Sequence, residues 1–261
     1  MVDVDLSPNR FQAFKLPSFS YICFLLQLKM ACVDHDYDTI LLPMKGASSL
    51  GVFGPPYSGK SYLVRKILEN ADKMYEKKVS HVLYCYGIYL QEFESMKKTI
   101  NNLTIHEGLP DENLVSRMSK NGDHFIIVLD DLQESLNRSK EAALLFTKGC
   151  HHNGFSLIYM GHNLYGAGQF SRLISLNVHY MIIFRSNRDR AQIAHLARQL
   201  MGGKGQGKSD YFMKAYELAI SEPHGFLFVD NHPSTVDEKY RLRSHILPES
   251  QPTIIYTPKL V

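Results

Sequence analysis

Short apolar segments alternate with amphipathic segments along most of the chain. The apolar segments are rich in β-branched and aromatic side chains, and polar residues or glycines bound them. Such runs are typical of strands that are buried on both faces of a parallel sheet. The pattern predicts five strands, at Ser49–Phe53, His81–Gly87, His124–Asp130, Phe155–Gly161 and His179–Arg185.

Helical spacing of apolar residues fills the intervals between these strands. The predicted helices cover Lys60–Lys78, Tyr89–Thr99, Glu112–Lys120, Ser139–Lys148 and Gly168–Leu176. The run Leu103–Gly108 fits either a small extra strand or a loop. Because strand and helix alternate, we expect an α/β fold with a doubly wound, mainly parallel sheet.

The pattern changes after Arg185. Two helices are predicted at Asp189–Met201 and Ser209–Ile220, followed by a strand at Gly225–Asp230 and a charged segment at Asp237–Arg243. We therefore expect residues 45–188 to form the core and residues 189–261 a small C-terminal α/β extension packed on it. Residues 1–44 form an N-terminal extension of unknown role.

The N-terminal extension contains one apolar stretch, Phe19–Val33, which Gln27 and Lys29 interrupt. It is too short for a membrane span and lacks the basic flank and cleavage site of a signal peptide. We expect a short packed helix or strand and no membrane span. Residues 1–29 could also precede a true start at Met30.

Composition is that of an ordinary globular protein, with 44% apolar and 21% charged residues. The net charge of +3 excludes a basic field over the whole molecule, so any nucleic-acid contact must come from local patches. The four cysteines have no metal-ligand spacing, which favours reduced thiols in an intracellular, reducing compartment.

Residues 54–61 match the phosphate-binding pattern G-x-x-x-x-G-K-[ST] between a predicted strand and a predicted helix. In that context backbone N–H groups and the helix dipole point at a polyphosphate. Lys60 would reach the β- and γ-phosphates, and the Ser61 hydroxyl would bind Mg²⁺. The motif predicts ATP with Mg²⁺ as the ligand. The predicted nucleotide-binding residues are Gly54, Pro55, Pro56, Tyr57, Ser58, Gly59, Lys60, Ser61 and Tyr62.

The same pattern occurs again at residues 202–209. Here a predicted helix, and no strand, comes before the glycines, which indicates a helix C-terminus. We interpret this second match as a solvated connector, with a DNA-contacting loop as the alternative.

A second chemical signal is the apolar strand that ends in Asp130 and Asp131. A carboxylate at the carboxyl end of a buried strand is typical of a Walker B element, and Asp130 would hold Mg²⁺ opposite Ser61. Asp131 occupies the position where related ATPases place the acid, usually Glu, that polarises the attacking water. Glu134 is the alternative base, and both acids also suit the start of a helix.

Two further polar residues are candidates for the reaction. Asn163 follows the strand Phe155–Gly161, at the position of the polar γ-phosphate sensor of ATPases with an inserted strand between the phosphate-loop and Walker B strands. A turn-capping role is its alternative. Arg172 lies where ring-forming ATPases often carry an arginine finger for the neighbouring subunit's nucleotide, and Arg188 is a second candidate.

Together with these motifs, an ordered set of segments resembles the FtsK/HerA-type DNA-packaging ATPases of polinton-like elements and adenovirus-like DNA viruses. The segments are Thr147–His152, Gly161–Asn163, Ser171–Asn177, Arg188–Asp189, Ala197–Gln199, Gly225–Asp230 and Leu242–Arg243. The resemblance covers residues 45–247, and Asp131 departs from it by replacing the usual Glu.

This resemblance implies a P-loop NTPase in which an inserted strand separates the Walker B strand from the phosphate-loop strand. It further implies an ATPase that moves double-stranded DNA into a capsid as a homo-oligomeric ring, hexameric or similar. A capsid or portal protein would be a partner, and the protein would act in the nucleus, a virus factory or the virion.

Two other functions remain open from the residues alone. One is a P-loop nucleotide or small-molecule kinase, and the other is a non-catalytic nucleotide-binding switch derived from a mobile element. Kinases usually lack the inserted strand and carry an arginine-rich lid, whereas intact Lys60, Ser61 and Asp130 argue against decay to a switch. The chain has no Asn-Lys-x-Asp guanine motif and no dinucleotide fingerprint.

Overall fold

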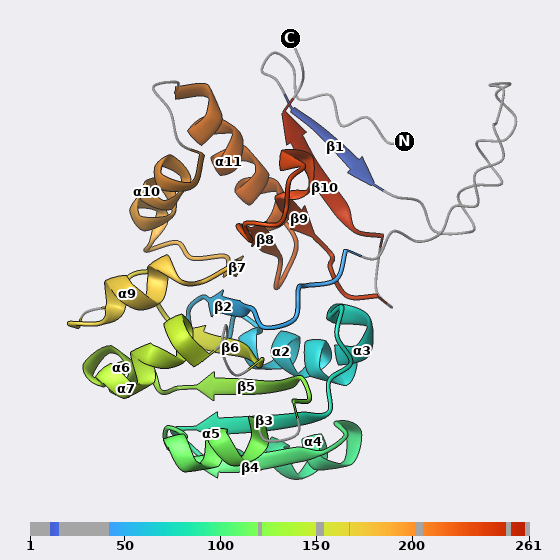
Figure 1. Ribbon diagram of the computed structural model, residues 1–261. Helices are drawn as coiled ribbons and strands as arrows, with labels where there is room; N and C mark the ends of the chain where they lie inside the picture. Colours follow the sequence, from blue (N-terminus) through green and yellow to red (C-terminus); the bar gives the residue numbers. More distant parts are fainter. Residues whose placement is uncertain are drawn as a thin grey trace, which may run out of the picture.

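A single sheet of ten strands organises the computed structural model (Figure 1). The structure describes residues 11–15, 42–119, 122–149, 154–166, 168–201, 206–248 and 252–258. The strands are β1 (Phe11–Lys15), β2 (Ser49–Phe53), β3 (His81–Tyr86), β4 (Leu103–Glu107), β5 (Phe125–Asp130), β6 (Ser156–Gly161), β7 (Tyr180–Phe184), β8 (Phe226–Asp230), β9 (Leu242–Ser244) and β10 (Ile254–Pro258).

The six strands from β2 to β7 form a parallel core in the spatial order β4-β3-β5-β6-β2-β7. Strand β6 therefore lies between β2 and β5, which confirms the predicted inserted strand. All five strongly predicted strands are present, and Leu103–Glu107 forms a strand too. Most residues of β2, β3, β5, β6 and β7 are buried, as continuous apolar runs require, whereas the edge strand β4 is partly exposed.

An antiparallel extension continues the sheet beyond β7, through β8, β9, β10 and β1. Strand β8 was predicted, whereas β1, β9 and β10 were not. Part of the N-terminal extension thus joins the sheet, because Phe11–Lys15 pairs with Ile254–Pro258. The apolar stretch Phe19–Val33 lies outside the described residues.

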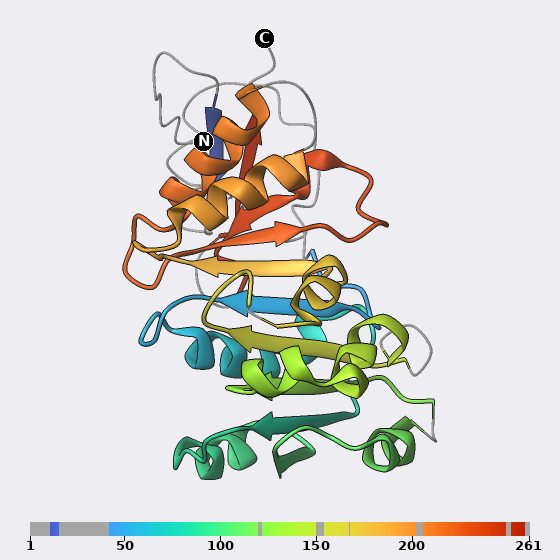
Figure 2. The same cartoon turned by 90° about the vertical axis from the view of Figure 1, so that its left-hand side faces the viewer.

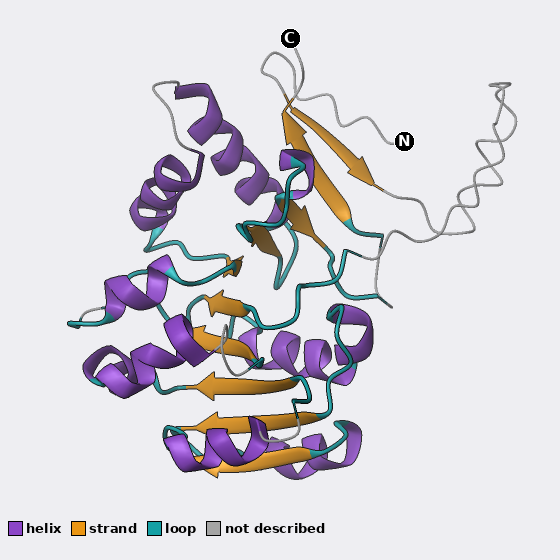
Figure 3. Cartoon of the chain, viewed as in Figure 1, coloured by secondary structure: helices purple, strands orange, loops and turns teal. Residues whose placement is uncertain are grey.

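Helices cover both faces of the sheet, as the doubly wound prediction requires (Figures 2 and 3). The α-helices are α2 (Lys60–Glu69), α3 (Ala71–Met74), α4 (Glu92–Thr99), α5 (Glu112–Ser119), α6 (Gln133–Arg138), α7 (Lys140–Leu144), α9 (Ser171–Leu176), α10 (Arg190–Met201) and α11 (Gln206–Ala219). A π-helix, η1 (Leu145–Gly149), follows α7, and a 3₁₀ turn, η2 (Glu238–Tyr240), precedes β9.

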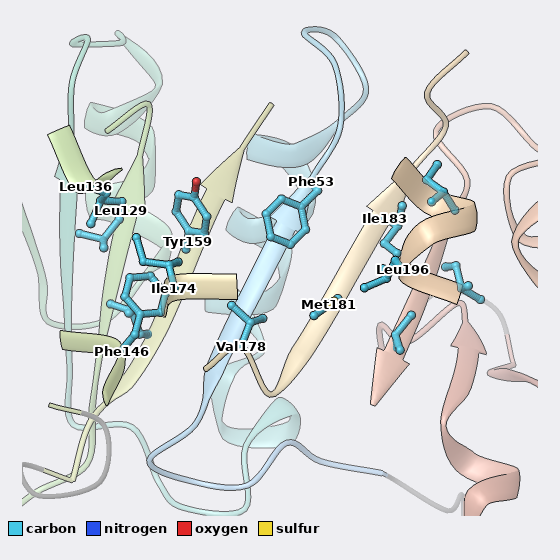
Figure 4. Packing of buried hydrophobic residues seen from close by; sticks show 14 of the residues in the cluster. Phe53, Leu129, Leu136, Phe146, Tyr159, Ile174, Val178, Met181, Ile183 and Leu196 are labelled. Carbon is cyan, nitrogen blue, oxygen red and sulfur yellow. The ribbon is translucent and has the colours of Figure 1, made fainter. Parts of the chain in front are cut away.

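Each face of the sheet has its own hydrophobic core. Helices α2, α3 and α4 pack on one face around Val64, Ile67 and Phe93. On the other face, shown in Figure 4, residues of α5 to α7 and α9 to α11 pack on the sheet. There the rings of Phe53 and Tyr159 meet edge-on, with centroids 5.8 Å apart. These two strand ends lead directly into the phosphate loop and the tip of β6.

Several helix boundaries differ from the sequence prediction. The expected helix Lys60–Lys78 is broken at Asn70, whose side-chain amide and backbone N–H both donate to the Lys66 carbonyl. This local bond ends α2 at Glu69, and the short α3 follows. Helix α4 begins at Glu92 rather than Tyr89, and helix α6 was not predicted at all.

Within the described residues, no helix combines the length and apolarity that crossing a membrane demands. Cys85 is a buried free thiol, and burial raises its pKa to about 12. Cys23, Cys32 and Cys150 lie outside the described residues.

Candidate nucleotide site

The candidate site lies at the carboxyl edge of the parallel strands, the edge toward which the arrowheads of β3 and β5 point in Figure 1. Strand β2 leads into the phosphate loop, β5 ends in Asp130, and β6 ends just before His162 and Asn163. Because β6 pairs with both β2 and β5, the structure brings these three segments to one place. Ligands of open α/β sheets bind at this edge.

The phosphate loop, residues 54–61, needs glycine at two positions. A Cβ on Gly54 would lie 2.7 Å from Phe184 Cβ, which is too close for any side chain. Gly59 has φ +105°, a left-handed conformation that glycine adopts without strain, and α2 begins at the next residue. The loop is fixed at its start by a hydrogen bond from Gly54 N–H to the Gly161 carbonyl of β6.

Lys60 is folded back onto the loop. Its ammonium donates to the carbonyls of Gly54 at 2.7 Å and Pro55 at 2.9 Å, and the residue is only 9% exposed. Burial lowers the pKa of Lys60, while the nearby charges of Asp130 and Asp131 oppose that shift. A buried cation that binds backbone carbonyls in this way can exchange them for phosphate oxygens.

Asp130 is held by a residue that the sequence did not single out. The hydroxyl of Tyr84, on the neighbouring strand β3, donates to Asp130 Oδ2 at 2.7 Å. Tyr84 is 2% exposed, so this bond forms inside the protein. Burial raises the pKa of Asp130, and the Tyr84 hydrogen bond works against that rise. The second carboxylate oxygen, Oδ1, has no hydrogen bond to the described part of the chain.

Asp131 and Glu134 lie in different surroundings. Asp131 has φ +55°, and its Oδ1 lies 3.6 Å from His162 Nε2 at the tip of β6. Its carbonyl would lie 2.5 Å from a Cβ at position 87, so Gly87 permits the close approach of the two loops. Glu134 pairs with Arg138 at 2.7 Å on the exposed side of α6. The geometry thus favours Asp131 as the acid that faces the β6 tip.

A second residue outside the prediction, Gln133, ties α6 to the tip of β6. Its amide oxygen accepts from His162 N–H at 3.0 Å, and its amide nitrogen donates to the Asn163 carbonyl at 3.3 Å. Both bonds leave the side chain of Asn163 exposed. The backbone of the predicted sensor is therefore fixed while its amide group stays accessible.

The exposed Asn163 side chain borders a cleft of about 540 Å³. The cleft is lined by Pro55, Pro56, His162, Asn163, Arg185, Ser186, Asn187, Arg188 and Asp189. The structure therefore places the start of the phosphate loop, the β6 tip and two arginines around one space. Arg172 does not line this cleft and is exposed on α9.

The residues present fit a magnesium nucleotide. Ser61 offers an exposed hydroxyl at the start of α2, and Asp130 offers one carboxylate oxygen; both are hard oxygen ligands that Mg²⁺ prefers. No group of three or more His, Cys, Asp or Glu side chains with metal-binding geometry occurs among the residues that the structure describes. The phosphates and water would thus supply the other ligands, as is usual for Mg²⁺ at nucleotide sites.

The second match to the phosphate-binding pattern falls in a different setting. Helix α10 precedes it, and its last four residues, from Gln206 to Ser209, form the first turn of α11. Residues 202–205 lie outside the described residues. A helix comes before these glycines, as predicted, whereas a strand leads into the phosphate loop at Gly54.

These features define the class: the chain has the fold of a P-loop NTPase with an inserted strand. No protein-family model and no curated protein sequence matches it. Among solved structures, it is similar to the genome packaging NTPase B204 from Sulfolobus turreted icosahedral virus 2 in complex with ATP-γS. The match has 13% identity and a TM-score of 0.50, over 82% of this chain and 98% of that one.

Two other solved structures are similar. The DNA-packaging ATPase B204 from Sulfolobus turreted icosahedral virus matches with 12% identity and a TM-score of 0.47, over 72% of this chain and 94% of that one. EssC (ATPases 2 and 3) from Geobacillus thermodenitrificans matches with 11% identity and a TM-score of 0.46, over 82% of this chain and 40% of that one.

Proposed function

We propose that the chain is an ATP-hydrolysing motor that translocates double-stranded DNA into a viral or virus-like capsid. The observation that carries this proposal is the position of β6, between the phosphate-loop strand β2 and the acidic strand β5. This order brings a polar strand tip, Asn163, to the phosphate loop. The genome packaging NTPase B204 shares the fold over most of both chains, which supports the proposal.

When ATP binds, its phosphates would replace hydrogen-bond partners that Lys60 has in this structure. Lys60 would exchange the carbonyls of Gly54 and Pro55 for the β- and γ-phosphate oxygens of ATP. The Ser61 hydroxyl and Asp130 Oδ1 would hold Mg²⁺, which neutralises phosphate charge when bound. Tyr84 keeps the Asp130 carboxylate turned toward the site.

The hydrolytic step would use two residues near the phosphate loop and one from a neighbouring subunit. Asp131 would accept a proton from the water that attacks the γ-phosphate, and the Asn163 amide would orient that water. Arg172, exposed on α9, would act on the nucleotide of a neighbouring subunit in a homo-oligomeric ring. Double-stranded DNA would contact local basic patches, and a capsid or portal protein would be the docking partner.

Phosphate release from MgATP, measured without DNA, with single-stranded DNA and with double-stranded DNA, tests this function. We expect double-stranded DNA to raise the rate several-fold and Lys60→Ala to abolish turnover, because it removes the cation that the loop offers the phosphates. Transfer of the γ-phosphate to a nucleoside monophosphate, without DNA stimulation, would contradict the motor and identify a kinase. Tight ATP binding with no turnover would identify a switch.

A further inference from the structure

Residues 221–225, which belong to the loop between α11 and β8, lie against the phosphate loop. His224 Nδ1 is 3.1 Å from the Ser58 carbonyl oxygen, and because a carbonyl only accepts, Nδ1 carries the proton. The same Nδ1 would be 3.3 Å from a Cβ at Gly59. The imidazole of the exposed His224 therefore lies beside the peptide that joins Ser58 to Gly59, just before α2 begins.

This contact fixes the direction of a backbone donor. In a trans peptide the C=O of one residue and the N–H of the next point in opposite directions. A hydrogen bond that holds the Ser58 carbonyl toward His224 therefore turns the Gly59 N–H the other way, to the side of the peptide that faces away from His224. The N–H groups of a phosphate loop must point inward to bind an anion.

The 221–225 loop is built so that His224 stays in this place. His224 has φ +57°, a left-handed conformation that His adopts more readily than most residues with a side chain. Gly225 N–H donates to the Glu222 carbonyl at 3.0 Å, and a Cβ on Gly225 would lie 2.4 Å from the Ala219 carbonyl oxygen. Glu222 Oε2 also lies 3.3 Å from His245 Nε2, next to β9.

Helix α11 connects this contact to two other parts of the molecule. Its first turn carries the exposed Lys208, from the second glycine- and lysine-rich match. Near its end, the Tyr216 hydroxyl donates to the Phe184 carbonyl and accepts from Ser186 N–H, each at 3.1 Å. Ser186 lines the cleft beside the phosphate loop. Helix α11 is thus hydrogen-bonded to the end of β7 through Tyr216. The loop that follows α11 contacts the phosphate loop through His224.

We propose that His224 is a positioning residue of the nucleotide site: it holds the Ser58–Gly59 peptide in its phosphate-accepting orientation and couples the occupied loop to helix α11. This inference rests on the proposed binding of ATP at residues 54–61. It adds an intrasubunit route from the nucleotide to the C-terminal extension.

Three variants of the full-length chain separate the role of the side chain from that of the backbone. His224→Gly keeps the left-handed conformation but removes the donor. His224→Asn keeps both, because Asn tolerates φ > 0 and its amide nitrogen reaches to about the position of Nδ1. Ser221→Ala is the matched control, since Ser221 belongs to the same loop and its hydroxyl donates to the Leu218 carbonyl of α11, not to the phosphate loop.

The first readout is the dissociation constant of MgATP-γS, with thermal unfolding measured on each variant to show that it folds. Loss of one hydrogen bond at the loop should weaken binding by about tenfold in His224→Gly. Binding by His224→Asn and Ser221→Ala should stay within about twofold of the parent. Equal binding by His224→Gly and the parent, or equal loss in His224→Asn and His224→Gly, would overturn the inference.

The second readout is hydrogen exchange of peptides from α11, residues 206–219, with and without MgATP-γS. We expect nucleotide to slow exchange there in the parent and in His224→Asn, and to leave it unchanged in His224→Gly at saturating nucleotide. Slowing in His224→Gly equal to that in the parent would overturn the coupling. Lys60→Ala separates a failure of the His224 inference from a failure of the proposed ATP site. If Lys60→Ala binds nucleotide like the parent, the assignment of ATP to residues 54–61 is wrong.

Discussion

At the residue scale, the two acids at the end of β5, Asp130 and Asp131, lie in different surroundings. Asp130 accepts a buried hydrogen bond from Tyr84, whereas Asp131 turns through a left-handed backbone conformation toward His162. Glu134, one helical turn further, is paired with Arg138 on an exposed surface. The Glu134 side chain is also the more exposed of the two candidate bases, at 77% against 44% for Asp131, and it is Asp131 that lies beside the β6 tip.

The assignment of the base can be tested with two matched amide variants. Asp131→Asn should bind MgATP with nearly the parental affinity and hydrolyse it at least 100-fold more slowly, because the amide keeps the size but accepts no proton. Glu134→Gln should change the rate by less than about threefold, since it removes only an exposed ion pair. Single-turnover hydrolysis measures both. Loss of hydrolysis in Glu134→Gln alone would transfer the role to Glu134.

At the element scale, the pairing of β3 with β5 brings the Tyr84 hydroxyl to the Asp130 carboxylate and so restricts its orientation. Tyr84 and Asp130 lie on neighbouring parallel strands, and Tyr84 is almost completely buried. A hydrogen bond to a metal ligand restricts its orientation, and loss of such a bond typically lowers metal affinity 10- to 100-fold.

Tyr84→Phe removes this bond and retains the aromatic ring. We expect the Mg²⁺ concentration for half-maximal ATP-γS binding to rise about tenfold, with little change in nucleotide binding without Mg²⁺. Tyr86→Phe on the same strand is the matched control, because no hydrogen bond of its hydroxyl to Asp130 occurs in the structure. A parental Mg²⁺ requirement in Tyr84→Phe would show that Asp130 needs no such support.

The elements of the core could be predicted from the sequence because their signals are local. Strand β2 is an apolar run followed by a glycine motif, and β5 is an apolar run that ends in acids. The break at Asn70 was missed because one side-chain hydrogen bond overrides good helical spacing. Strand β9 was missed because it has three residues, and β10 because it is a short run that ends in Pro.

Long-range contacts in the site had no signal in the sequence. In the sequence, Tyr84 does not differ from other aromatic residues of a buried strand. Its contact with Asp130 depends on the pairing of β3 with β5, and the sequence pattern does not predict which strands pair. His224 meets Ser58 across 166 positions of the chain. The sequence indicated which residue types carry the chemistry, but the residues that orient them depend on which strands and loops become neighbours.

At the scale of the whole molecule, Arg172 would act as an arginine finger on the nucleotide of a neighbouring subunit in the proposed ring. Arg172 is exposed on α9 and does not line the cleft of its own subunit, whereas Arg185 and Arg188 do. A finger that acts between subunits should have this kind of placement, because it must be free to reach the neighbouring nucleotide. Sedimentation with and without MgATP should first establish that the chain assembles, and a strict monomer in both conditions would exclude the finger.

Arg172→Ala should then leave ATP binding near the parental value and lower hydrolysis by about 10³- to 10⁵-fold. Mixing it with Lys60→Ala subunits should restore part of the activity, because some interfaces then join an intact phosphate loop to an intact arginine. Arg138→Ala, which removes an exposed arginine paired with Glu134, serves as a control and should hydrolyse ATP normally. No recovery in the mixture, together with a lowered melting temperature, would indicate a structural arginine.

In the proposed motor, ATP hydrolysis at residues 54–61 moves the chain along double-stranded DNA. Displacement of a third strand from a DNA triplex, placed at increasing distances along a linear duplex, measures this movement directly. We expect displacement with MgATP, a delay that grows with distance, and no displacement with ATP-γS or by Lys60→Ala. Rapid ATP hydrolysis by an assembled, DNA-bound protein that leaves the third strand in place would contradict the account.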